Sequence, residues 1–151
     1  PSVEQVLGLE PSDGGSSVGG ENASTHGASA LVFGVQRSGC SNGGWNTWQW
    51  NRDYLKNDLT ANTVIISLGT NDHKGVNTFK ELMKTREKIS ASRVYWILPP
   101  CNDKFCKPNV NEVVEIIAKN FGDVIISTKK LQADAIHPST AGYKELAEKT
   151  K

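Results

Sequence analysis

A run of apolar, mostly β-branched residues that stops at a glycine constrains the fold of this chain more than any other feature. The run is Thr63-Val64-Ile65-Ile66-Ser67-Leu68, and Gly69-Thr70-Asn71-Asp72-His73 follows it directly. A continuous apolar run of this length predicts a strand covered on both faces, as in parallel sheets. Ligands of such sheets collect just beyond the carboxyl ends of the strands. We therefore expect Asn71 and Asp72 to lie at a binding site, although an ordinary polar turn has the same composition.

Strand-like and helix-like segments alternate along the chain. Further strands are predicted at 6–9, 30–36, 93–98 and 123–127, and helices at 45–57, 76–86, 110–121 and around Tyr143, Leu146 and Ala147. The first of these segments also fits a helix, with Ser2 and Gln5 as a capping box. Alternation with short links predicts a three-layer α/β/α sandwich with a five-stranded parallel sheet. The length of 151 residues fits a single domain over 1–151.

Charge and hydropathy restrict the partners. The net charge is +1, Lys and Arg are dispersed, and no apolar segment reaches transmembrane length. These features argue against a nucleic-acid partner, a membrane-surface partner and a membrane span. The compartment and the oligomeric state are not readable from the chain.

The three cysteines are Cys40, Cys101 and Cys106. An odd and small number does not make a disulfide framework, but Cys101 and Cys106 share a predicted loop and can pair. Three thiolates can also hold a metal ion; no spacing here matches a zinc signature, so we predict no metal site.

Three tryptophans, Trp45, Trp48 and Trp50, fall within six residues. They suit either a sugar-stacking platform or packing of a helix on the sheet, and packing is favoured because tryptophan is largely buried on average. A helix here would bring Trp48, Arg52 and Leu55 onto one face.

A second polar stretch, Asp134-Ala135-Ile136-His137-Pro138, follows the last predicted strand. A carboxylate beside an imidazole accepts the Nδ1 proton, fixes the tautomer and stabilises the imidazolium, so that Nε2 acts as a base. An N-cap aspartate beside a surface histidine has the same sequence. Its position, at the same edge of the sheet as Asn71, favours the catalytic interpretation.

Gly69-Thr70-Asn71-Asp72 and Asp134-Ala135-Ile136-His137-Pro138 resemble two signature blocks of the SGNH (GDSL-like) hydrolases, and Ser38-Gly39-Cys40-Ser41 resembles the glycine block of that family. The resemblance implies a flavodoxin-like SGNH hydrolase fold. It also implies that His137 is the general base, that Asp134 orients it, and that the Asn71 amide and the Gly39 backbone N–H form the oxyanion hole. Asp72 would brace the turn.

The nucleophile block Gly-Asp-Ser of that family does not occur in this chain. If the first strand is 6–9, Ser12 takes the nucleophile's place, and Ser16 and Ser17 are the alternatives. The segment from 10 to 29 is rich in Gly and Ser and does not predict the helix that follows the nucleophile in the family.

Together these features predict a serine esterase that hydrolyses a small ester, such as an acetyl group on a carbohydrate. Chemistry of this kind requires no metal ion and no organic cofactor. Two alternatives stay open. The first is a binding module for a glycan or a protein on the same fold, with its nucleophile lost. The second is a nucleotide binder, for which Gly14-Gly15-Ser16-Ser17 is a loose match to a phosphate loop.

Overall fold

A single six-stranded sheet forms the centre of the computed structural model, which describes residues 4–7, 28–32, 35–41, 43–56 and 59–151. The strand order is β2-β3-β1-β4-β5-β6. The strands are β1 (Glu4–Leu7), β2 (Ala28–Val32), β3 (Val35–Cys40), β4 (Leu59–Ile66), β5 (Ile89–Ile97) and β6 (Val124–Ile126). Without β2, this is the order of a doubly wound α/β sheet.

Five of these strands, β3, β1, β4, β5 and β6, are mutually parallel, as predicted, but β2 is a sixth strand that runs antiparallel to β3 at the edge. The single strand predicted at 30–36 is therefore wrong. Its described residues, 30–32 and 35–36, belong to two paired strands in which Val32 lies opposite Val35. Apolar and polar residues alternate in both strands of such a pair, so the alternation did not reveal where the chain reverses. The predicted strand 6–9 exists as β1, two residues earlier.

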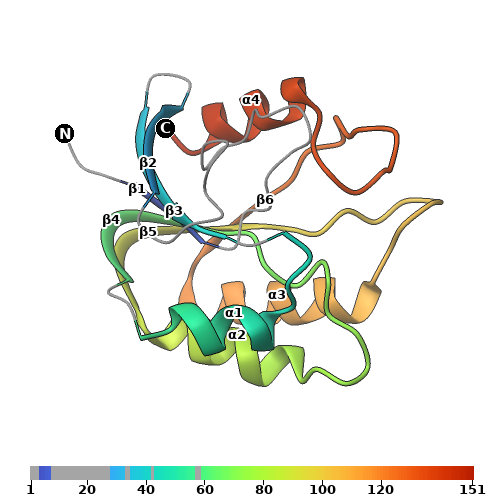
Figure 1. Cartoon of the computed structure of the whole chain (residues 1–151), viewed down its shortest axis with the longest axis horizontal. Coiled ribbons are helices and arrows are strands. Elements are labelled where there is room, and N and C mark those ends of the chain that lie inside the picture. Colours follow the sequence, from blue (N-terminus) through green and yellow to red (C-terminus); the bar gives the residue numbers. More distant parts are fainter. Residues whose placement is uncertain (1–3, 8–27, 33–34, 42, 57–58) are drawn as a thin grey trace.

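Helices cover both faces of the sheet, as the alternation predicted (Figure 1). The helices α1 (Thr47–Tyr54), α2 (Thr78–Glu87) and α3 (Pro108–Phe121) lie on one face, and α4 (Thr140–Lys149) lies on the other. Gly122 ends α3 in the left-handed conformation, as expected for a helix C-terminus. No helix in the described part of the chain is both long and apolar enough to cross a bilayer.

Strand β4 is buried on both sides. Val64 and Ile66 belong to the core beneath α1, α2 and α3, whereas Ile65 packs with Tyr143 and Leu146 of α4. All five side chains are at most 1% exposed. Burying a side chain of this size stabilises the fold by about 1.5–3 kcal/mol, so the apolar run alone accounts for the two helix layers.

The tryptophans separate into different environments. Trp50 is 1% exposed and its indole Nε1 donates to the Cys40 carbonyl at 2.9 Å. Trp48 is 52% exposed. The predicted burial of Trp48 is therefore wrong. Helix α1 begins two residues later than expected, after the N-cap residue Asn46. Its buried face carries Thr47, Trp50 and Asn51, and Trp48 lies off that face.

The turn after β4 requires a glycine. Gly69 has φ +109°, and a Cβ there would come within 2.7 Å of Val110 Cγ1 on α3. Glycine therefore fits this position for two reasons: it adopts the positive φ without strain, and it has no side chain to clash with α3. It allows the polar residues that follow to begin directly at the edge of the sheet.

Asp72 joins this turn to two helices, which confirms that it braces the turn. Its Oδ1 accepts from the Thr47 backbone N–H at 2.8 Å, and its Oδ2 accepts from the Thr47 and Thr78 hydroxyls, each at 2.7 Å. The carboxylate is 2% exposed and lies at the N-terminus of α1, where the helix dipole favours negative charge. Lys107 Nζ donates to the Asp72 carbonyl at 2.7 Å, so α3 is tied to the same point.

Asp72→Ala should therefore lower the free energy of unfolding by about 3 kcal/mol, because three hydrogen bonds to a buried carboxylate are lost and their donors lose a partner. Urea unfolding followed by circular dichroism measures this change. Asp103→Ala, at an exposed position, should change it by less than about 0.5 kcal/mol. Equal effects of the two substitutions would contradict the bracing role.

Candidate active site

A pocket opens at the carboxyl edge of the sheet, with walls from five segments of the chain. Its cavity volume is about 50 Å³. The segments follow β3, β4, β5 and β6 or belong to α4, and their main lining residues are Trp45, Ser67, Gly69, Asn71, Leu98, Pro100, Thr128, Ile136, His137 and Tyr143. The structure therefore brings Asn71 and His137, predicted as oxyanion donor and general base, to the same pocket.

The Asn71 side chain is oriented by the segment before α1. Its Nδ2 donates to the Trp45 carbonyl at 3.1 Å, and the residue is half-buried. Asp72 fixes the backbone of the adjacent residue, so the amide stands on a rigid turn.

His137 and Asp134 form the predicted pair. The distance from His137 Nδ1 to Asp134 Oδ2 is 2.6 Å. Asp134 Oδ1 also accepts from the backbone N–H groups of Ile136 at 2.9 Å and His137 at 3.0 Å. Burial raises the pKa of the Asp134 carboxyl, but the hydrogen bonds from the His137 ring and from these two N–H groups lower it by more, so the pKa lies below its usual value. Asp134 is therefore an anion that can orient an imidazole and stabilise an imidazolium.

The loop that carries this pair is closed by its own backbone. Leu131 and Pro138 form an antiparallel bridge, and the Gln132 N–H donates to the His137 carbonyl at 2.7 Å. Gly142 then brings the start of α4 against the preceding segment, since a Cβ there would lie 2.2 Å from the Lys130 carbonyl oxygen. Helix α4 thus begins close to the loop that carries His137.

Gly39 is the predicted second donor of the oxyanion hole. It lies inside β3, is buried, and pairs with Val6 on one side and with Ala28 on the other. Among the described residues that line the pocket, Gly39 is absent. Its assignment to the oxyanion hole stays a prediction.

The candidate nucleophiles Ser12, Ser16 and Ser17 lie outside the described residues. The same holds for the segment 14–17, the loose match to a phosphate loop. The described part of the chain therefore contains the predicted base, its predicted orienting acid and one predicted oxyanion donor.

The predicted pairing of Cys101 with Cys106 is confirmed, and Cys40 is buried outside this disulfide. The segment closed by the Cys101–Cys106 disulfide comes directly after Leu98, Pro99 and Pro100, which line the pocket. Sequence reasoning assigned no functional role to this loop. For Trp45 it considered sugar stacking, but not the contact of its carbonyl with the Asn71 amide. Contacts to backbone carbonyls do not depend on residue type, so no pattern in the sequence indicates them.

Comparison with known proteins adds a likeness in fold. No protein-family model and no curated protein matches the chain. A solved structure of a catalytic mutant of Axe2, an acetylxylan esterase from Geobacillus stearothermophilus, superposes with a TM-score of 0.56 at 14% sequence identity, over 97% of this chain and 91% of that chain. A second solved structure superposes with a TM-score of 0.52 at 13% identity, over 97% of this chain and 93% of its own. The chain thus shares the fold of an esterase.

Proposed function

We propose that this protein is a serine esterase of the SGNH type that hydrolyses a small ester, such as an O-acetyl group on a carbohydrate. The observation that carries this proposal is one pocket lined by both Asn71 and His137, with Asp134 hydrogen-bonded to His137 Nδ1. A binding module has no need of a base with an orienting acid. The fold shared with an acetylxylan esterase supports the same reaction class.

The proposed nucleophile is Ser12, with Ser16 and Ser17 as alternatives. Strand β1 is parallel to β4, and its last residue, Leu7, pairs with Ile66, so the chain leaves β1 at the pocket's edge of the sheet. Ser12 follows five positions later, and five residues span at most about 17 Å.

In the proposed reaction, the serine Oγ attacks the ester carbonyl while its proton passes to His137 Nε2. The Asn71 amide stabilises the negative oxygen of the tetrahedral intermediate, and we retain the Gly39 N–H as the predicted second donor. The intermediate collapses, the alcohol leaves with the proton from His137, and an acyl-enzyme remains. Water then attacks with His137 as the base, and the acid is released.

The pocket and its rim suit a small acyl group on a sugar. A cavity volume of about 50 Å³ is small, which favours a short acyl group such as acetyl. At the rim, Arg52 lies 5.4 Å from the ring centroid of Trp45, which lines the pocket, and 5.2 Å from that of the exposed Trp48. Aromatic faces beside a charged, hydrogen-bonding group are well suited to a sugar ring.

A fluorophosphonate probe should label the protein at Ser12, as located by mass spectrometry, and the protein should hydrolyse p-nitrophenyl acetate. His137→Ala should abolish both, because it removes the base. His73→Ala, at an exposed histidine of the loop after β4, should leave both unchanged. Neither adduct nor turnover in the parent protein would favour a glycan- or protein-binding module instead.

Asn71→Ala should lower kcat for p-nitrophenyl acetate by about 10²–10³-fold with little change in KM, because the amide donor acts on charge that develops in the transition state. Steady-state kinetics measure this, with Asn109→Ala, an exposed asparagine, as the matched control. A change confined to KM would remove Asn71 from the oxyanion hole.

Trp48→Ala should raise KM for an acetylated xylo-oligosaccharide by roughly fivefold, because a stacking surface for the sugar is lost. KM for p-nitrophenyl acetate should not change. Phe79→Ala, on α2, removes a comparably exposed aromatic side chain, 45% exposed against 52% for Trp48, and should affect neither substrate. Equal effects of Trp48→Ala on both substrates would argue against a carbohydrate at this rim.

A further inference from the structure

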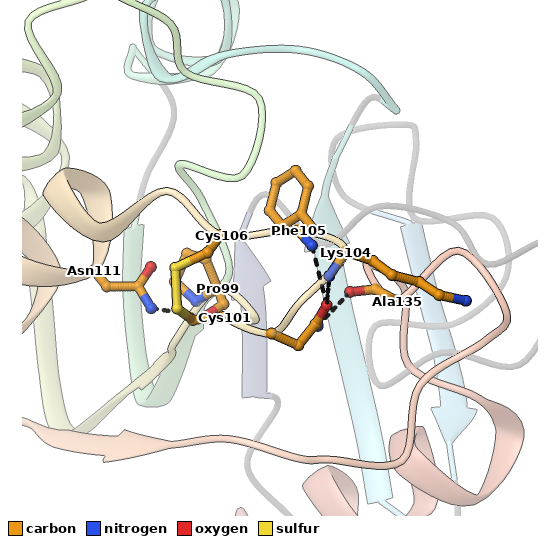
Figure 2. Close-up of a disulfide and its surroundings, with 8 residues drawn as sticks. Pro99, Cys101, Lys104, Phe105, Cys106, Asn111 and Ala135 are labelled. Atoms are coloured by element: carbon orange, nitrogen blue, oxygen red, sulfur yellow. Dashed lines mark hydrogen bonds between the residues drawn. A yellow bond between two sulfur atoms is a disulfide. The ribbon is translucent and has the colours of Figure 1, made fainter.

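The loop closed by the disulfide, residues 101–106, contacts the loop that carries Asp134 and His137. Cys101 and Cys106 face each other as an antiparallel bridge as well as a disulfide, and the Asn102 N–H donates to the Phe105 carbonyl at 2.8 Å. Figure 2 shows this loop beside Ala135, the residue after Asp134. We call residues 101–106 the disulfide loop.

The Asn102 side chain uses both ends of its amide. Its Oδ1 accepts from the backbone N–H groups of Lys104 at 2.9 Å and Phe105 at 3.0 Å, which holds the side chain in place within the disulfide loop. Its Nδ2 donates to the Ala135 carbonyl at 3.0 Å. The dashed lines in Figure 2 include this contact to Ala135. The side chain thus connects a covalently closed loop to the loop of the catalytic pair.

Ala135 has a backbone conformation that alanine rarely adopts. Its φ is +59°, and it is the one non-glycine residue with positive φ among the described residues. This conformation lets Asp134 Oδ1 accept from both Ile136 and His137 while Oδ2 faces His137 Nδ1. A left-handed alanine persists only where its surroundings hold it, and such residues cluster at functional sites.

We propose that Asn102 is a positioning residue for the Asp134–His137 pair, and that the Cys101–Cys106 disulfide keeps Asn102 in place for this purpose. The catalytic part of this inference rests on the proposed esterase function. The pair is solvent-accessible, with side chains 38% exposed for Asp134 and 30% for His137. Core packing therefore does not fix it, and the hydrogen bonds around Ala135 decide its geometry.

Asn102→Asp tests the inference most sharply. Aspartate keeps an acceptor for the Lys104 and Phe105 N–H groups but has no donor for the Ala135 carbonyl. We expect kcat for p-nitrophenyl acetate to fall roughly tenfold, the worth of one such hydrogen bond, with KM within about twofold. The downfield NMR signal of the His137 Nδ1 proton should weaken. Lys104→Gln changes the net charge by the same amount in the same loop and should alter neither readout.

The double substitution of Cys101 and Cys106 by serine tests the role of the disulfide. It should weaken the same NMR signal and lower kcat to a similar extent, while the melting temperature shows that the fold persists. A parent-like signal and kcat in both Asn102→Asp and the double variant would overturn the inference, as would an equal loss in Lys104→Gln.

The two proposals fail differently. If the parent protein hydrolyses no ester and takes no fluorophosphonate label, the esterase function falls. The NMR signal still decides the positioning role in that case: its loss in Asn102→Asp but not in Lys104→Gln upholds it, and its persistence in Asn102→Asp overturns it.

Discussion

The burial of β4 on both faces is the constraint on which the rest of the structure depends. Val64, Ile65 and Ile66 have no exposed surface, so helices must cover the sheet on either side. Because the neighbouring strands β1 and β5 run parallel to β4, their carboxyl ends share an edge with it. Every segment that lines the pocket either leaves the sheet at that edge or packs against it. Core packing thus brings together polar residues that are 66 positions apart, as Asn71 and His137 are.

Two aspartates at this edge show how environment separates structural from chemical roles. Asp72 is 2% exposed, and its carboxylate is held by one backbone N–H and two threonine hydroxyls, which are neutral donors that do not titrate. Asp134 is exposed and shares its carboxylate between two backbone N–H groups and an imidazole, which can gain a proton. Only the second arrangement can respond to charge that develops during a reaction. Asn71, which precedes Asp72, is a neutral hydrogen-bond donor and can attract a negatively charged oxygen.

The sequence predicted the parallel sheet, its two helix layers, the bracing role of Asp72, the Asp134–His137 pair and the Cys101–Cys106 pairing, because each depends on local spacing or on residue type. It missed the reversal between β2 and β3, since alternation of apolar and polar residues looks the same in one strand or in two. It misjudged Trp48, because helical spacing shows which residues share a face but not which face is buried, and the buried face of α1 carries Thr47, Trp50 and Asn51. The contacts of Trp45 with Asn71 and of Asn102 with Ala135 were beyond sequence reasoning, since they involve backbone carbonyls that carry no sequence signal.

The disulfide loop lies beside the exposed Asp134–His137 pair, where packing alone does not hold the side chains in place. In the proposed reaction a substrate must reach His137, and the side chains of the Asp134–His137 pair are 38% and 30% exposed, so they lack the packing that keeps core residues in place. The loop 131–138 is held instead by hydrogen bonds within its own backbone. It also contains Ala135 in the left-handed conformation, which contacts with neighbouring residues must stabilise. The neighbouring segment between β5 and α3 is also exposed, but the Cys101–Cys106 disulfide closes it, and the Asn102 side chain connects it to the Ala135 carbonyl by a hydrogen bond. The exposed edge of the site is thus held by a cross-link and hydrogen bonds, whereas its inner edge, at Asn71, is held by the buried carboxylate of Asp72.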